Sequence, residues 1–182
     1  NTQQRDAANY GLALGYLKTG KHAEARKILA ALIVKKPFEL AFQHSDIELD
    51  IAVEDYKGAL LKLDRLLLQN PDNYPLTRLK SEALWQAHRY EESGQVLTGL
   101  SRKRSQDPMI WYRLAEVRGL AGNISGVHQA RAEYFILVGG FDMAREQLTL
   151  AAKLVVADFT RSAIIRQRLR DVVAMEDRLR KL

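Results

Sequence analysis

The sequence of 182 residues is long enough for one globular domain or a short array of repeats, and its 47% hydrophobic and 27% charged residues are ordinary for a folded protein rather than a disordered one. It has no cysteine, which excludes disulfide bonds, thiol catalysis and thiolate metal sites. The net charge is +6, and no apolar run approaches the roughly 18–20 residues needed to cross a bilayer, so we expect no insertion into a membrane. Good helix formers dominate and only 4 prolines interrupt them, which indicates an all-α fold.

The first element in chain order is a helical hairpin. Residues 16–25 read as a helix, a turn that contains Gly20, and a second helix. Pro37 ends that second helix, and Pro71 ends the second helix of the next pair. The step between these prolines is about 34 residues, which is the period of the tetratricopeptide repeat, a pair of antiparallel helices. We therefore predict repeats at about residues 6–39, 40–73, 74–107 and 108–140.

Small and apolar residues recur in step with this period. In the repeat pattern, position 20 holds a small residue, at which the second helix of a pair crosses the first, and position 24 holds a leucine. These two positions hold Ala25, Ala59, Ser93 and Val127, then Leu29, Leu63, Leu97 and Arg131. The second repeat departs from the pattern, because Asp46 and Asp50 occupy places that are usually apolar. Each pair has more apolar surface than it can bury alone, so we expect neighbouring pairs to stack.

Two further helices are expected after Gly139, at about residues 141–156 and 158–181. Residues 131–144 also read as the start of a repeat shifted by half a period, which predicts that one helix serves two neighbouring pairs. The last helix carries an apolar stripe typical of a terminal cap, made of Ile165, Leu169, Val172, Met175, Leu179 and Leu182. The whole chain is predicted to be one all-α domain, residues 1–182: a right-handed tetratricopeptide-repeat solenoid of about ten antiparallel helices with a long C-terminal capping helix.

Side chains that could catalyse a reaction or bind a metal show no productive spacing. The four histidines, His22, His44, His88 and His128, are far apart, and no His-Glu-x-x-His pair is present. Gly139-Gly140 lacks the preceding strand and the Gly-Lys-Ser/Thr ending of a phosphate loop. We expect no catalytic residue, no metal ligand and no cofactor in this chain.

We expect a protein partner to bind the inner face of the solenoid, which the first helix of each pair lines. Positions 5, 9 and 12 of these helices supply aromatic, basic and acidic side chains. The predicted binding residues are Tyr10, His44, Glu48, Arg78, Glu82, Trp85, Tyr112 and Glu116. Tyr, Trp and Arg dominate the binding energy of many interfaces. The alternatives are that the three glutamates form a solvated helix face and that Trp85 packs between repeats.

The C-terminal helix is basic. Residues 161–182 include seven basic and three acidic residues, a net charge of +4. A basic surface suggests nucleic acid as a ligand. Acids alternate with the arginines here, however, and no aromatic residue lies among them, so we do not expect nucleic-acid binding.

Three segments resemble one particular kind of repeat domain. They are residues 10–20, residues 48–56 and, above all, residues 129–144. They resemble the C-terminal tetratricopeptide region of periplasmic zinc metallopeptidases related to the β-barrel-assembly-enhancing protease, and the resemblance covers nearly the whole chain. It implies that a His-Glu-x-x-His peptidase domain precedes the repeats and holds the zinc. This chain is then the excised recognition part of a periplasmic protease and chaperone. Its partners are expected to be the β-barrel assembly machinery or outer-membrane protein substrates.

One alternative within the same fold stays open. A free-standing adaptor or pilotin-like lipoprotein would use the same repeats without any enzyme. It predicts a lipobox cysteine just upstream of Asn1.

Overall fold

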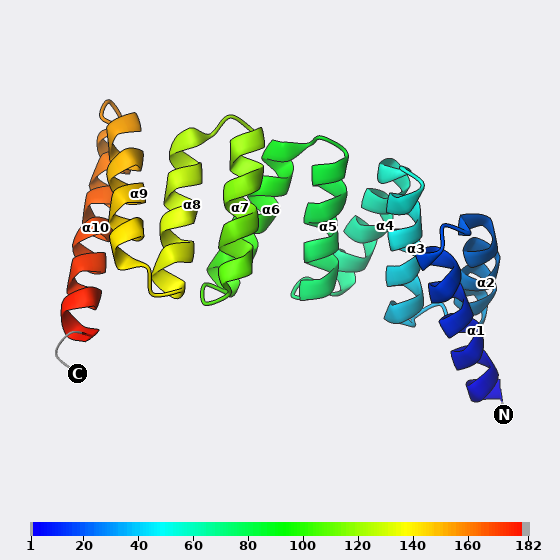
Figure 1. The fold of residues 1–182 in the computed structure, drawn as a ribbon. Coiled ribbons are helices and arrows are strands. Elements are labelled where there is room, and N and C mark those ends of the chain that lie inside the picture. Colours follow the sequence, from blue (N-terminus) through cyan, green and yellow to red (C-terminus); the bar gives the residue numbers. More distant parts are fainter. Residues whose placement is uncertain (1, 180–182) are drawn as a thin grey trace. The chain divides into compact units, whose positions relative to one another are not determined.

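The computed structural model describes residues 2–179, and these form ten helices and no strand (Figure 1). The chain divides into two compact units, Asn1–His88 and Arg89–Leu182. The helices of the first unit are α1 (Thr2–Lys18), α2 (His22–Lys35), α3 (Leu40–Ala52), α4 (Tyr56–Gln69) and α5 (Tyr74–Gln86). Those of the second unit are α6 (Tyr90–Lys103), α7 (Pro108–Leu120), α8 (Ile124–Leu137), α9 (Phe141–Leu154) and α10 (Phe159–Leu179). The expectation of one domain stays a prediction.

The helices confirm the all-α fold, and the starts of the first helices keep a constant step along the chain. Helices α3, α5 and α7 begin at Leu40, Tyr74 and Pro108, the positions at which the sequence placed the repeat starts. The second helices α4, α6 and α8 keep the same step. Capping side chains explain several of these starts, since Asn73 accepts a hydrogen bond from the Leu76 N–H and Asp55 accepts one from the Gly58 N–H.

Each first helix ends in the same left-handed turn. A residue with positive φ follows it at Gly20, Glu54, His88 and Gly122, once in every repeat and at the same repeat position. The next residue donates a backbone hydrogen bond five residues back, as from Lys21 N to the Tyr16 carbonyl at 2.9 Å and from Asn123 N to the Arg118 carbonyl at 2.8 Å. This is the Schellman motif, which satisfies the last carbonyls of a helix and reverses the chain.

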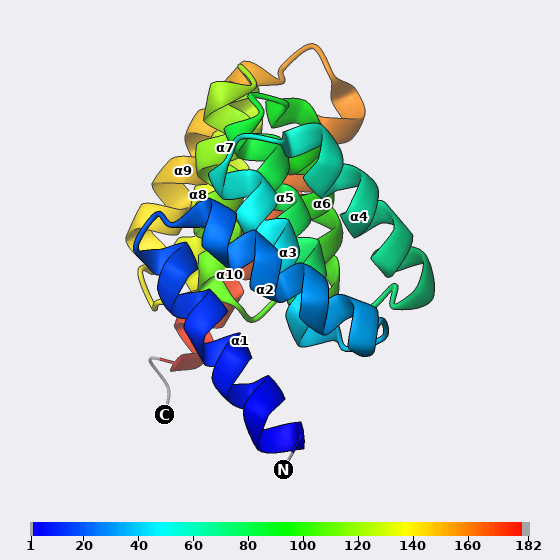
Figure 2. The same cartoon turned by 90° about the vertical axis from the view of Figure 1, so that its right-hand side faces the viewer.

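The first unit packs its helices through small residues and through ion pairs. The helix crossings at Ala25 and Ala59 are fully buried, as are Leu29 and Leu63 four residues later. Figure 2 shows α4 to one side of α3 and α5, away from α1. Asp6 of α1 is 3% exposed and lies 3.3 Å from the ammonium groups of both Lys35 and Lys36, so the end of α2 is tied back to α1.

The two aspartates that depart from the repeat pattern belong to an ion cluster around one buried carboxylate, that of Asp50. Asp50 is only 2% exposed and lies 2.8 Å from Arg26 of α2 and 2.6 Å from Lys62 of α4. Lys62 also pairs with Asp46. Burial opposes the charge of Lys62, but its hydrogen bonds to both aspartates outweigh burial and raise its pKa. The cluster therefore joins α2, α3 and α4 through charged side chains.

The second unit confirms the half-period shift. The Gly139 turn before α9 is left-handed, and Gly140 N donates to the Phe135 carbonyl, as in the turns that follow first helices. Helix α8 packs against both α7 and α9, so it is the second helix of one pair and the first of the next. The core of the second unit includes Ala132, Ala144, Leu148, Ile165 and Val172, all of which are buried.

The apolar stripe of the last helix is right in part. Ile165 and Val172 are buried, and Leu169 packs against the core. Leu179 is 56% exposed, which corrects its assignment to the packed side. Helix α10 is longer than α9, and its last turn extends beyond the start of α9 (Figure 1). Leu182, Arg180 and Lys181 lie outside the described residues.

We predict that Glu54→Gly stabilises the first unit. The backbone of Glu54 has φ of 63°, in the left-handed region, which favours glycine because glycine has no Cβ. The free energy of unfolding should rise by about 0.5–1 kcal/mol, measured by urea titration. Gly20→Ala, at the equivalent turn, should lower it by about 1 kcal/mol. A loss of stability in Glu54→Gly would show that its side chain contributes more than the turn geometry does.

We also predict that Lys62→Met destabilises the chain by about 1–3 kcal/mol, because it leaves the buried Asp50 carboxylate with Arg26 alone. Asp50→Asn in the Lys62→Met background should recover part of this loss, since a neutral amide is easier to bury. The matched control is Lys57→Met, an exposed lysine of the same helix. The contribution of Lys62 should persist below its ordinary pKa of 10.5 and disappear as the pH rises through the higher pKa in the folded state. Equal effects of the two lysine variants would contradict the cluster's role.

Candidate protein-interaction surfaces

Six of the eight predicted binding residues lie on neighbouring helices of the first unit. Helix α3 packs against both α1 and α5, so the first helices of these three pairs form a continuous layer. We call their predicted binding positions the first-helix face. It consists of Tyr10 on α1, His44 and Glu48 on α3, and Arg78, Glu82 and Trp85 on α5.

Tyr10 is used largely for contacts within the fold. Its ring is half-buried and packs on Phe42 with ring centroids 5.0 Å apart. Its hydroxyl donates to the Ala41 carbonyl at 3.1 Å and lies 3.0 Å from the Ser45 Oγ, which is itself buried. Tyr10 therefore holds α1 against α3, and its ring, being half-buried, is only partly open to a partner.

The acidic side chains of the first-helix face have local polar partners. His44 Nδ1 lies 3.5 Å from a carboxylate oxygen of Glu48, one helical turn away. Glu82 accepts a hydrogen bond from Gln86 at 3.0 Å. Arg78, one turn before Glu82, is exposed. The face thus presents alternating charges held in position by neighbours, a pattern suited to a polar segment of another protein.

Trp85 lies in the last turn of α5 and is half-buried. Its indole nitrogen is shielded from solvent, so part of the ring packs inside the unit. The alternative that Trp85 supports the fold therefore has structural support beside its predicted binding role. Substitution of this residue would affect packing as well as binding.

The other two predicted residues, Tyr112 and Glu116, lie one turn apart on α7 in the second unit. Tyr112 is 49% exposed, and its ring centroid lies 5.9 Å from that of Tyr134 on α8. Glu116 is exposed and accepts a hydrogen bond from Arg113 at 3.1 Å. Tyr112 is thus an aromatic side chain whose ring is supported on one side and open on the other, the arrangement of a binding anchor.

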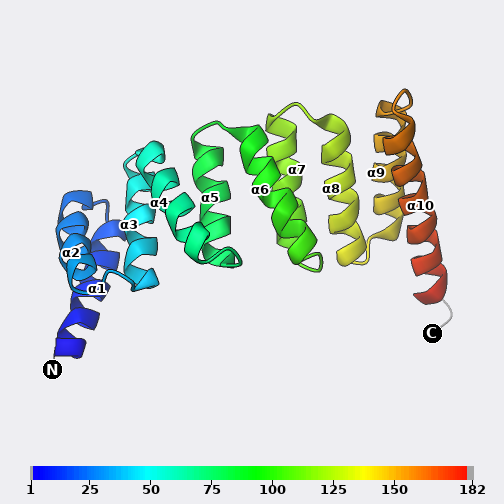
Figure 3. The same ribbon diagram turned by 180° about the vertical axis from the view of Figure 1, so that it is seen from behind.

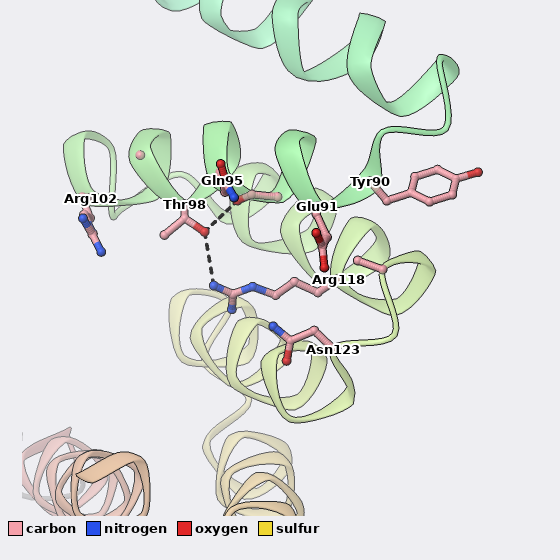
Figure 4. A pocket seen from close by; sticks show the side chains of 10 residues that line it. Tyr90, Glu91, Gln95, Thr98, Arg102, Arg118 and Asn123 are labelled. Carbon is pink, nitrogen blue, oxygen red and sulfur yellow. Dashed lines mark hydrogen bonds between the residues drawn. The ribbon is translucent and has the colours of Figure 1, made fainter. Parts of the chain in front are cut away.

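The sequence did not predict a hollow of about 550 Å³ beside Arg118 in the second unit (Figure 4). It lies along α6 and is bordered by Arg118 of α7 and by the turn that follows α7. We call it the Arg118 hollow. Its polar lining consists of Tyr90, Glu91, Gln95, Thr98, Arg102, Arg118 and Asn123.

Arg118 is held in this hollow by neutral acceptors. Its guanidinium donates to the Gly126 carbonyl at 3.1 Å and to the Thr98 hydroxyl at 3.3 Å, and that hydroxyl donates to the Gly94 carbonyl. Gly126 leaves room for the arginine, because a Cβ at this position would lie 2.8 Å from the Arg118 Cδ. No carboxylate among the described residues pairs with Arg118, and burial lowers its pKa. Repeat positions gave no signal for this site, since it depends on where α6, α7 and α8 meet.

Within residues 2–179, no group of three or more His, Asp or Glu side chains is arranged to hold a metal ion. No helix in the same range has both the length and the apolar composition to cross a membrane.

Comparison with known proteins defines the class. A tetratricopeptide-repeat family model matches residues 50–117. The solved structure of MamA from Desulfovibrio magneticus RS-1 superposes with a TM-score of 0.64 at 14% identity and covers 94% of this chain and 95% of that one. A tetratricopeptide repeat protein from Parabacteroides merdae gives a TM-score of 0.57 at 14% identity, over 91% of this chain and 70% of that one. Residues 50–117 thus match the tetratricopeptide repeat, and the solved structures show the same fold over nearly the whole chain; such repeats form scaffolds for protein–protein interaction.

Curated relatives are more similar in sequence. The chain is 29% identical over 157 residues to the β-barrel assembly-enhancing protease of Escherichia coli K12, covering 85% of this chain and 32% of that protein. It is 24% identical over 175 residues to the protein of the same name from Yersinia pestis, covering 96% of this chain and 36% of that one. The chain thus spans about a third of the length of these relatives.

We predict that Tyr112→Ala reduces binding while leaving the fold intact. With the chain as bait in envelope extract, capture of its protein partners should fall about ten-fold, because a half-exposed aromatic anchor is lost. Quantitative mass spectrometry of the captured proteins measures the effect, and circular dichroism checks the fold. Leu68→Ala, on the outside of α4 and 85% exposed, is the matched control. Unchanged capture by Tyr112→Ala would remove Tyr112 from the binding surface.

Proposed function

We propose that this chain is the partner-recognition part of a larger periplasmic zinc metallopeptidase that acts in outer-membrane protein assembly and quality control. The observation that carries the proposal is the extent of the similarity: it runs through 85% of this chain but occupies 32% of a β-barrel assembly-enhancing protease. A repeat domain of that size leaves room in the relative for a separate catalytic part. The proposed partners are the β-barrel assembly machinery or its outer-membrane protein substrates.

The arrangement of the surfaces supports recognition rather than chemistry. In the first unit, the first-helix face combines Arg78 with the carboxylates of Glu48 and Glu82. In the second unit, α7 carries the half-exposed ring of Tyr112. Charged groups set the choice of partner and its orientation, while a supported aromatic ring supplies much of the binding energy. Catalysis and zinc would belong to the other part of the protein.

The gene that encodes the chain provides the first test. The proposal expects a reading frame that continues upstream and encodes a His-Glu-x-x-His motif. In the full-length protein, Glu48→Lys combined with Glu82→Lys should reduce co-purification of barrel assembly components about ten-fold or more by reversing two charges. Hydrolysis of an unfolded test protein such as casein should not change, because the active site is elsewhere.

Two outcomes would contradict the proposal. A stop codon upstream, followed by a separate secretion signal and a lipobox cysteine, would favour a free-standing lipoprotein adaptor. Unchanged co-purification by the charge-reversed protein would mean that the first-helix face does not bind these partners. Glu24→Lys together with Glu146→Lys, two exposed glutamates outside the first-helix face, gives the same change of charge and is the control.

A further inference from the structure

The half-period shift of α8 leaves an open place in the second unit. Figures 1 and 3 show α7, α8 and α9 side by side. Helices α6 and α10 lie on one common side of this row, behind it in Figure 1 and in front of it in Figure 3. In a regular array the second helix of the fourth pair would lie in the layer of α6 and α10. Here α8 packs between α7 and α9 instead. The layer of second helices is therefore interrupted behind α8.

A hollow of about 470 Å³ occupies this place, and we call it the back groove. Helices α6 and α10 form its walls, while α7, α8 and α9 contribute to its floor. The residues that line it include Thr98, Arg102, Trp111, Arg118, Leu148 and Ile164. It shares Thr98, Arg102 and Arg118 with the Arg118 hollow, so the two hollows meet at these side chains.

The back groove has an apolar part that is open to solvent. Leu148 and Ile165 are buried beneath it, each 2% exposed, whereas Ile164 is 61% exposed. Trp111 is fixed in place because its indole N–H donates to the Ser105 carbonyl at 2.9 Å. A rigid aromatic ring beside an exposed isoleucine is an apolar surface that gains free energy when it is covered.

The two ends of the back groove differ in charge. At the α10 side, Arg168 is neutralised by a two-point contact with Glu133 at 2.7 and 2.5 Å. At the α6 side, Arg118 has only neutral acceptors, and within the described residues nothing pairs with Arg102. Arg118 also lies against the first turn of α8, where the helix dipole adds positive potential. A partner's carboxylate at the α6 end would be stabilised by Arg118, by Arg102 and by the dipole of α8.

We propose that the back groove binds an amphipathic helix of a partner protein, which takes the place of the absent second helix. Apolar side chains of that helix cover Trp111 and Ile164, and an Asp or Glu of the helix pairs with Arg118 and Arg102. The proposal rests on the role of the chain in protein interaction, but it concerns a different surface from the first-helix face.

A helix suits this site better than an extended peptide. The walls and floor of the back groove are helices, whose backbone groups are already paired. An extended segment would find no strand edge on which to satisfy its own N–H and C=O groups, whereas a helix satisfies them internally. The groove's position between α6 and α10 also matches the place in which this fold itself stacks helices.

The test uses a phage-displayed library of helical peptides of about 18 residues, selected on the intact chain. Enriched peptides should carry apolar residues at i, i+3 or i+4, and i+7, with an acidic residue beside them. Binding of a synthesised peptide should weaken about ten-fold with Arg118→Met and about ten-fold with Ile164→Asp. It should stay within about two-fold with Arg170→Met, which removes a positive charge elsewhere on α10, and with Tyr112→Ala.

Ile164 is exposed in the free chain, so Ile164→Asp leaves folding intact and keeps the proposal testable even where Arg118→Met does not fold. Failure to enrich helical acidic peptides, or unchanged binding by Ile164→Asp, would overturn it. Suppose that one of these two results is found and that capture from envelope extract depends on Tyr112 but not on Ile164. The back-groove proposal would then be overturned, and the proposed function would stand.

Discussion

Two helices of a pair can lie close together only where a small side chain stands at their crossing and the chain reverses within a few residues. In this protein Ala25 and Ala59 are fully buried at such crossings, and left-handed residues end the first helices. Both requirements recur with the repeat period, so the order of the helices follows from them. In the first unit the first helices of successive pairs are then neighbours, which is why predicted binding positions from distant parts of the sequence lie in one layer there.

The same constraint explains the altered second unit. Helix α8 has small or medium buried residues on more than one side, among them Val127, Ala130 and Ala132. It can therefore pack closely against α7 and against α9. Arg131 stands where the other second helices have a buried leucine, and it is exposed. The result is a helix shared by two pairs and an open groove behind it, so a change in packing creates a surface that a regular array lacks.

Polar groups within the fold limit what the candidate surfaces can do. The hydroxyl of Tyr10 and the carboxylate of Asp50 are committed to contacts between helices. Charged clusters of this kind contribute little net stability compared with apolar packing, but they penalise every alternative register, since a misplaced pair would leave a buried charge alone. Among the positions predicted to bind a partner, those that keep an open side include Arg78 and Glu48 in the first unit and Tyr112 in the second.

The sequence alone determined the helices, their period and the half-period shift, because these depend on local propensity and on the spacing of small residues along the chain. The binding role of the first helices stays a prediction, although six of the eight predicted residues lie on neighbouring helices. Only the tertiary structure decided that Asp50 is neutralised by residues of two other helices, and that Arg118 lies over Gly126 without a carboxylate. The back groove is of the same kind, since five helices form it and no single stretch of sequence records their approach.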